Sequence, residues 1–238
     1  MLKEAIEKIE VMAQPRIQVI DGRTYAIHQD YIQEIRPEMD TPELLKVFSL
    51  NALEELVTND TGDLGQLFVS VEAFNRVRVY GELEKENRWR RVHLFTAEAS
   101  DVPGWEPKIE MPFDEATVAL LTRFQDGGDK EYVLRLLSQI TTGAKVTYSD
   151  NGVASTMVMT KGASLAENVT IKPIVKLRPY RTFQEVEQPE GLFLIRIRER
   201  GIAFIEADGG MWKLTARQTV KNWLDERLRS LDCVTVML

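Results

Sequence analysis

Arginine residues that alternate with other residue types are the side chains best suited to chemistry in this sequence. Arg196, Arg198 and Arg200 lie two residues apart, as do Arg76 and Arg78. Because side chains of a strand alternate between its two faces, each set would share one face of a sheet. Guanidinium groups form paired hydrogen bonds to phosphate and stack on bases. The pattern predicts an anion-binding surface, although a solvated face or an intersubunit ion-pair network is the simpler interpretation of such charge runs.

Further arginines flank an aromatic residue, because Arg178 and Arg181 lie on either side of Tyr180. An arginine beside an aromatic ring is typical of surfaces that bind phosphate or stack on bases. The candidate anion ligands are therefore Arg76, Arg78, Arg178, Arg181, Arg196, Arg198 and Arg200.

Four acidic residues near the C-terminus are weak candidates for a metal site. Glu185 and Glu187 lie two apart in an expected strand, and Glu206 and Asp208 do the same just before Gly209-Gly210. If these two runs paired, their carboxylates would supply the oxygen ligands that Mg²⁺ and Ca²⁺ prefer. Solvated face and turn residues explain the same pattern more simply, so no metal site is predicted.

The sequence lacks the residues that most enzymes of this size use. It contains two histidines and one cysteine, too few for a four-ligand structural zinc site. His93 follows two arginines in an expected strand, where a surface or half-buried residue is a better interpretation than a general base. Neither a nucleophile elbow nor a phosphate-binding loop occurs. We expect a nonenzymatic protein without a cofactor.

Composition supports an ordinary globular protein rather than a disordered or membrane-spanning one. The chain has 238 residues, 44% of them hydrophobic, and a net charge of −7. Its acidity argues against coating nucleic acid by bulk charge. Cys233 is the single cysteine, which fits a reducing compartment. The N-terminal residues are interrupted by charges and do not resemble a secretory signal, so we expect a cytoplasmic location.

The first half of the chain predicts one helix, a hairpin, a second helix and a meander. Apolar spacing predicts a helix over residues 2–13, and Asp21-Gly22 predicts a hairpin between 17–20 and 24–27. Residues 29–39 read as loop or edge, and residues 46–48 as a short strand. Ser49 is expected to cap a helix over 50–58, before a turn at 59–62. Three alternating runs, 67–71, 76–80 and 89–97, predict an antiparallel meander followed by a linker over 101–112.

The second half repeats this theme. Residues 117–124 are ambiguous, whereas 130–141 predict a helix that Asp126 or Asp129 would cap. Hairpins are expected around 150–152 and 200–201, with strands at 169–177 and 183–187 between them. Thr215 is expected to cap a last helix through residue 231, ahead of a strand over 233–238. The predicted class is α+β, predominantly antiparallel β meanders with about four helices. The predicted halves are 1–105 and 106–238, with one continuous domain as the alternative.

Two stretches resemble a known family. They are LRPYRTFQEVEQP at residues 177–189 and FIEADGGMW at residues 204–212. They are similar to phage- and prophage-encoded proteins of unknown function, distantly YfdQ-like. The resemblance implies a phage accessory protein in the host bacterial cytoplasm and brings no catalytic residue with it. A folding role also explains the stretches, because proline forces extended geometry before it and Trp212 is expected to be buried near Trp223.

Three functions were weighed from these observations. The favoured one is a homo-oligomeric binding protein that acts in counter-defence, by blocking a host protein or by sequestering a small anionic ligand. We expect its interface to use sheet edges and the face of Arg196, Arg198 and Arg200. The alternative is a DNA-metabolism accessory that contacts single-stranded nucleic acid through Trp89 and Tyr180. A metal-dependent hydrolase built on the four acidic residues is the second alternative.

Overall fold

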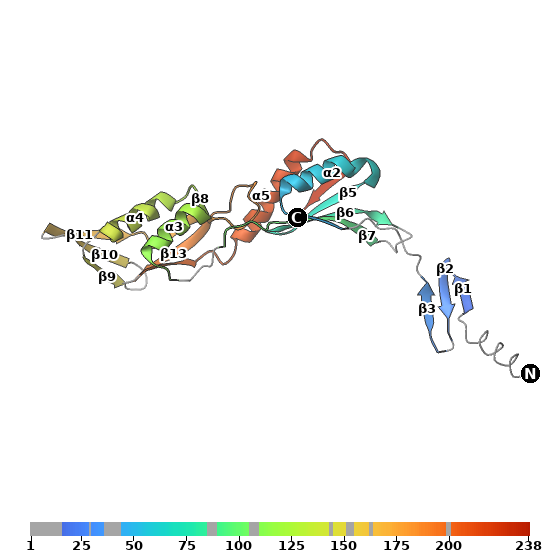
Figure 1. Cartoon of the computed structure of the whole chain (residues 1–238), viewed down its shortest axis with the longest axis horizontal. Helices are drawn as coiled ribbons and strands as arrows, with labels where there is room; N and C mark the ends of the chain where they lie inside the picture. Colours follow the sequence, from blue (N-terminus) through green and yellow to red (C-terminus); the bar gives the residue numbers. More distant parts are fainter. Residues whose placement is uncertain are drawn as a thin grey trace, which may run out of the picture. The chain divides into compact units, whose positions relative to one another are not determined.

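The chain forms two compact units, Met1–Pro42 and Glu43–Leu238. The computed structural model describes residues 16–28, 30–35, 44–84, 90–104, 110–142, 145–150, 155–161, 164–198 and 201–238. The helix predicted over residues 2–13 lies outside the described residues. The fold is α+β and dominated by mostly antiparallel sheets, as the sequence predicts (Figure 1).

A small antiparallel sheet makes up the described part of the first unit. Its order is β1 (Arg16–Ile20), β2 (Arg23–Ile27) and β3 (Ile32–Ile35). Asp21 and Gly22 have φ angles of 50° and 77°, the left-handed values that a tight two-residue hairpin needs. The predicted hairpin is therefore confirmed, and the stretch read as loop or edge contains the edge strand β3.

The second unit contains a five-stranded sheet in the order β15-β5-β6-β7-β4. The predicted meander is confirmed by β5 (Leu67–Ala73), β6 (Arg76–Glu84) and β7 (Arg90–Glu98), which pair antiparallel. The edge strands β4 (Leu45–Val47) and β15 (Val234–Met237) pair in parallel with β7 and β5. Strand β15 comes from the end of the chain, so residues far apart in sequence complete this sheet.

Two helices cover one face of that sheet, as Figure 1 shows. They are α2 (Leu50–Leu64) and α5 (Trp212–Arg227). Leu53 of α2, Val220 of α5 and Val79 of β6 are fully buried in one core between helices and sheet. Alternation along β5 to β7 places the apolar side chains on this covered face and the polar ones on the other.

The helix ends differ from those predicted. Ser49 caps α2 as expected, since its Oγ accepts from the backbone N–H of Ala52 at 3.1 Å, but the helix continues through the predicted turn and ends before Gly65. Gly65 has a φ of 65°, which favours glycine and ends the helix. Helix α5 begins at Trp212 rather than after Thr215, and it ends at Arg227.

A second sheet has the order β14-β13-β12-β8 and packs against two helices. Its strands are β8 (Phe124–Gln125), β12 (Ile174–Pro179), β13 (Gly191–Ile197) and β14 (Ile202–Glu206), and its helices are α3 (Phe113–Arg123) and α4 (Lys130–Thr142). The ambiguous residues 117–124 are thus helical up to 123. Asp126 and Asp129 were expected to cap α4, but their side chains accept other hydrogen bonds. Asp126 accepts from Lys130 Nζ, and Asp129 accepts from Lys172 Nζ and from the backbone N–H of Lys176.

Strands β9 (Lys145–Asp150), β10 (Ser155–Lys161) and β11 (Ser164–Ile171) form a further antiparallel sheet. This confirms the predicted pairing around residues 150–152, although residues 151–154 lie outside the described part. The hairpin of β13 and β14 is confirmed as well. The predicted strand 169–177 is divided at Lys172–Pro173 between β11 and β12. The two predicted halves, 1–105 and 106–238, both contribute to the layer around the five-stranded sheet. Helix α5 and strand β15 belong to the second half, yet both contact β5 of the first half.

Candidate functional site

Residues 180–190, which contain most of the first stretch that carries the family resemblance, form an irregular loop after β12, so the strand predicted over 183–187 is wrong. The buried side chain of Gln188 organises this loop. Its Oε1 accepts from the backbone N–H of Arg181 at 2.9 Å and of Thr182 at 3.2 Å, while its Nε2 donates to the carbonyls of Phe183 and Val186. A side chain inside the loop therefore satisfies backbone groups that a neighbouring strand would satisfy in a sheet.

The same loop ties together several distant elements. Thr182 Oγ1 donates to the carbonyl of Phe74 in the β5–β6 turn, and Gln184 donates to the carbonyl of Asp101 in the predicted linker. The Gln188 N–H donates to Gln125 of β8 at 2.9 Å. These bonds connect the five-stranded and the four-stranded sheet and account for the stretch as a folding element.

Arg181 lies at the most buried ionic contact of this loop. Its side chain is 8% exposed, pairs with Glu206, and places the guanidinium carbon 4.4 Å from the Trp212 ring centre and 5.1 Å from that of Phe193. Burial lowers the pKa of Arg181, although the charges of Glu206 and Asp208 oppose that shift. Its Nε and Nη2 atoms have no hydrogen-bond partner among the described residues. The guanidinium thus depends on Glu206 for compensation.

The two tryptophans expected to be buried together differ. Trp212 is buried, and its ring meets Phe74 edge-on with centres 4.9 Å apart. Trp223 is partly buried and packs against the core beside α5, with the Arg227 guanidinium 4.9 Å from its ring centre, so full burial is confirmed for Trp212 and only partial burial is seen for Trp223. The reason is its position on α5, at the margin of the core formed by Val220 and Leu224.

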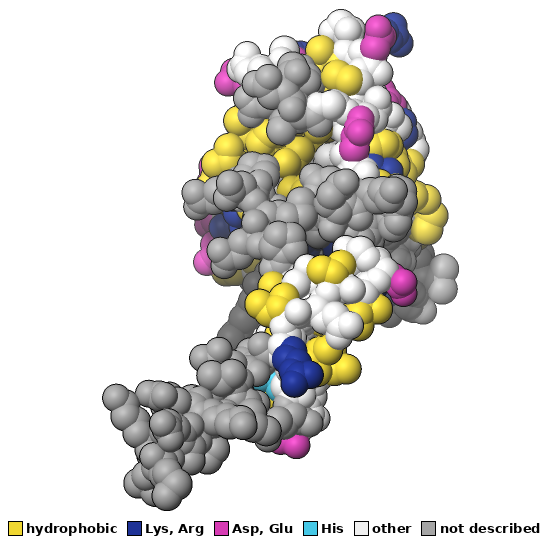
Figure 2. Space-filling view, turned by 90° about the vertical axis from the view of Figure 1, so that its right-hand side faces the viewer, with side chains coloured by type: hydrophobic (Ala, Val, Ile, Leu, Met, Phe, Trp, Pro, Cys, Tyr) yellow, Lys and Arg dark blue, Asp and Glu magenta, His cyan; other side chains and the backbone are white. Residues whose placement is uncertain are grey.

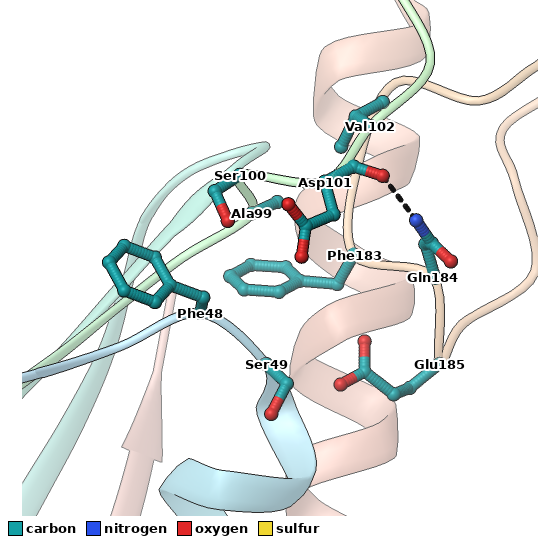
Figure 3. Close-up of a pocket in the computed structure, with 9 residues that line it drawn as sticks. All are labelled: Phe48, Ser49, Ala99, Ser100, Asp101, Val102, Phe183, Gln184 and Glu185. Atoms are coloured by element: carbon teal, nitrogen blue, oxygen red, sulfur yellow. Dashed lines mark hydrogen bonds between the residues drawn. The ribbon is translucent and has the colours of Figure 1, made fainter.

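A cleft of about 330 Å³ opens beside the loop, at the start of α2 (Figure 3). The rings of Phe48 and Phe183 form its apolar part, Phe48 being exposed and Phe183 buried. Polar oxygens of four side chains surround the rings, and the lining includes no lysine or arginine. These side chains are Ser49, Ser100, Asp101 and Glu185. Aromatic faces beside carboxylates suit a cationic group with an apolar stem.

Glu185 belongs to this cleft rather than to a metal site. Its Oε1 accepts from the backbone N–H of Leu50 at 2.8 Å, where a carboxylate complements the positive end of α2. Glu187 pairs with Arg178, Glu206 pairs with Arg181, and Asp208 accepts from the N–H of Gly210 at 3.0 Å. Each of the four acidic candidates thus has a separate partnership. The described residues contain no group of three or more ligand-type side chains that could hold a metal.

The six candidate arginines within the described residues belong to different elements. Arg76 and Arg78 are on β6 of the five-stranded sheet, whereas Arg178 is on β12 and Arg196 on β13 of the four-stranded sheet. Arg178 lies between Glu187 and Glu190, and Arg198 pairs with Glu110 at 2.9 Å. Arg200 lies outside the described residues. The structure therefore places Arg76 and Arg78 together on one strand, whereas Arg178, Arg181, Arg196 and Arg198 belong to other elements.

The face of the five-stranded sheet opposite α2 and α5 combines aromatic and basic side chains. Phe68 of β5, Tyr80 of β6 and His93 of β7 are successive partners across the sheet; we call them the aromatic row. The next row along the strands contains Arg78 and, on β4, Lys46. The sequence signal for these residues was the alternation in each predicted strand, but only pairing of the strands brings them side by side.

Electrostatics on this face follow from its half-buried position. Burial lowers the pKa of His93, and the nearby Arg78 adds to the shift while the carbonyl of Phe95 opposes it, so the imidazole is neutral near pH 7. A hydrogen bond with Tyr80 and the charge of Glu72 raise the pKa of Arg78. The face therefore presents a neutral aromatic row next to permanent positive charges.

Searches against family models, curated proteins and solved structures give no significant match. The described residues form no helix long and apolar enough to cross a membrane.

Proposed function

We propose that this chain is a nonenzymatic, homo-oligomeric binding protein of a phage, which acts in the host cytoplasm and assembles through the sheet of its first unit. The observation that carries the proposal is the exposure of apolar side chains on that sheet. Ile17 and Val19 are 69% and 65% exposed, and Ile32 on the other edge strand is 64% exposed. Monomeric proteins rarely leave neighbouring large aliphatic residues uncovered in this way.

Strand register gathers these residues on defined faces. Ile17 pairs with Ala26 and Val19 with Thr24, which in turn pairs with Ile35, so these side chains share one face. Hydrophobic side chains do reach the surface in several places of the described chain (Figure 2). A three-stranded sheet is stable when such a face is covered, because burial stabilises it by about 25 cal/mol per Å².

A second copy is the occupant we favour, because strand β1 can pair with itself. In an antiparallel pair of two β1 strands centred on Gln18, Ile17 of one copy lies opposite Val19 of the other, and Arg16 lies opposite Ile20. No like charges would face each other, and β1 contains no proline to block its edge. The pairing is two-fold symmetric and therefore closes the edge instead of extending it.

The arginine face expected to form the interface is less suitable. Arg198 pairs with Glu110 of its own chain, so a partner's carboxylate would have to displace an existing ion pair. The exposed aliphatic residues of the first unit have no such competitor. They therefore replace the arginine face as our preferred interface.

The cleft beside α2 supports a protein as the bound partner. Its aromatic rings and carboxylates suit the ammonium or guanidinium of a lysine or arginine side chain, whereas a small anion would meet Asp101 and Glu185. Of the two counter-defence roles, blocking a host protein therefore fits this cleft better than sequestering an anion there.

Light scattering coupled to size exclusion tests the assembly. The full chain is expected to run as an oligomer at micromolar concentration, and Ile17→Lys with Val19→Lys should convert it to a monomer. Val118→Lys with Leu121→Lys is the matched control, because these residues of α3 are 58% and 59% exposed. A monomeric wild-type chain would overturn the proposal. So would dissociation by the α3 substitutions alone.

A further inference from the structure

The open face of the five-stranded sheet has the features of a surface for single strands of nucleic acid. Helices α2 and α5 pack on the other face of this sheet, so no element among the described residues of the second unit covers the aromatic row of Phe68, Tyr80 and His93. We propose that this face binds single-stranded nucleic acid, with bases on the aromatic row and phosphates on the neighbouring cations. The inference goes beyond self-association and does not depend on it.

The aromatic row provides adjacent platforms on three neighbouring strands. Phe68 pairs directly with Tyr80, and Tyr80 pairs with His93 with ring centres 5.2 Å apart. Sheets that bind single strands stack successive bases on aromatic side chains of adjacent strands. Side chains placed in this way can therefore receive unpaired bases without rearrangement of the backbone.

Two contacts fix the orientation of these rings. The hydroxyl of Tyr80 donates to Glu72 at 2.7 Å, and Glu72 lies four residues along β5 from Phe68, the partner of Tyr80. The phenol ring is therefore held along the sheet in the direction of Glu72. The guanidinium of Arg91 lies 3.7 Å from the centre of the Phe68 ring, so a base over Phe68 would stack on this guanidinium rather than on the ring itself.

Positive charge is concentrated on this face although the chain has a net charge of −7. Two carboxylates hold the cations in place: Glu72 pairs with Arg78 at 3.1 Å, and Glu98 pairs with Arg76 at 3.0 Å and Lys46 at 2.5 Å. With Arg91, which donates a hydrogen bond to the carbonyl of Gly81, four cations accompany these two carboxylates. The excess charge complements a phosphate backbone.

The alternation of rings and cations favours a single strand over a duplex. Bases of a duplex are stacked inside the helix and cannot reach the aromatic row, whereas an unpaired strand exposes them. An anion without bases would use the cations but not the rings. The ligand class that uses both parts of this face is single-stranded DNA or RNA.

Fluorescence anisotropy with a fluorescein-labelled oligothymidylate and the full chain tests the proposal. Binding is expected at low salt and should weaken as salt rises, because phosphate contacts release counterions. Tyr80→Leu should weaken binding about tenfold, since a stacked base loses its platform, while Tyr80→Phe keeps the ring and should retain most of the affinity. Arg78→Gln should lower the slope of log affinity against log salt by about one.

Matched controls separate this site from general charge effects. Arg198→Gln makes the same charge change just after β13, outside the five-stranded sheet, and should leave the affinity unaltered. Thermal unfolding followed by circular dichroism shows whether each variant is folded. The proposal is overturned by any one of three results: no binding at low salt, equal affinities of folded Tyr80→Leu and wild type, or equal affinity for a labelled duplex. Oligomeric state is measured separately, so failure here leaves the assembly proposal standing.

Discussion

Replacing Glu206 by glutamine removes the negative charge that faces the buried guanidinium of Arg181 and leaves the shape of the side chain nearly unchanged. Arg181 is 8% exposed, whereas Glu206 is 26% exposed at its side chain. Breaking a buried ion pair by removing one partner costs about 3–5 kcal/mol, because the other charge stays desolvated. The remaining charge of Asp208 acts on Arg181 in the same sense, which places the expected loss near the lower end, about 3 kcal/mol.

Differential scanning calorimetry measures this effect. For a domain of 150–250 residues, each kcal/mol shifts Tm by about 2–4 °C, so the variant should melt about 6–12 °C below wild type. The rings of Trp212 and Phe193 would still face the guanidinium, but their contribution is present in both proteins and cancels.

Glu187→Gln is the control for the same chemical change. Glu187 pairs with Arg178 in the same loop, but its side chain is 67% exposed, so the pair contributes only about 0–1 kcal/mol. A Glu206→Gln shift no larger than that of Glu187→Gln would refute the conclusion that burial decides the energy of the Arg181 contact.

Three further predictions concern stability. Gln188→Leu should lower the free energy of unfolding by about 3 kcal/mol or more in urea titrations, because it leaves buried backbone groups of the loop without partners. Gly128→Ala should lower the denaturation midpoint more than Gly209→Ala. Both glycines have a positive φ, and the backbone strain of alanine there costs about 1 kcal/mol at either position. Only at Gly128 would the added Cβ also overlap the carbonyl of Lys176. Burial alone would raise the pKa of Asp129, but hydrogen bonds from a lysine side chain and from the Lys176 backbone, with the lysine charges, lower it below the ordinary 3.8. The stabilisation that this carboxylate supplies is therefore present above pH 3.8 and lost as pH falls through the lowered pKa, so urea titrations of wild type and Asp129→Asn should converge at acidic pH.

Local sequence determined many of the secondary elements. Asp21-Gly22 favours the positive φ angles of a hairpin, Ser49 can cap a helix whatever follows, and alternation in residues 67–71 specifies a half-buried strand. Each of these depends on neighbours in the chain and needs no distant contact. The number of histidine and cysteine residues, two and one, is likewise too small for a four-ligand structural zinc site whatever the structure.

Helix ends and the loop at residues 180–190 show where local reasoning fails. The alternation around Glu185 and Glu187 resembles a strand, yet the side chain of Gln188 and contacts to Phe74 and Gln125 hold those residues in an irregular loop. Contacts made with residues more than sixty positions away cannot be read from spacing. For the same reason, residue spacing could not predict that Arg181 of this stretch would be buried against Glu206.

Only the tertiary structure decided which side chains act together. Arg76 and Arg78 are joined to Lys46 and the aromatic row because β4 to β7 pair in one sheet, while Arg178 and Arg196 lie on the four-stranded sheet. The cleft beside α2 arises from three segments that are distant in sequence, at residues 48–49, 99–102 and 183–185. The sequence determines which residue types are present and how they alternate, whereas strand order and long-range packing determine which of them become neighbours, because those contacts depend on the whole chain.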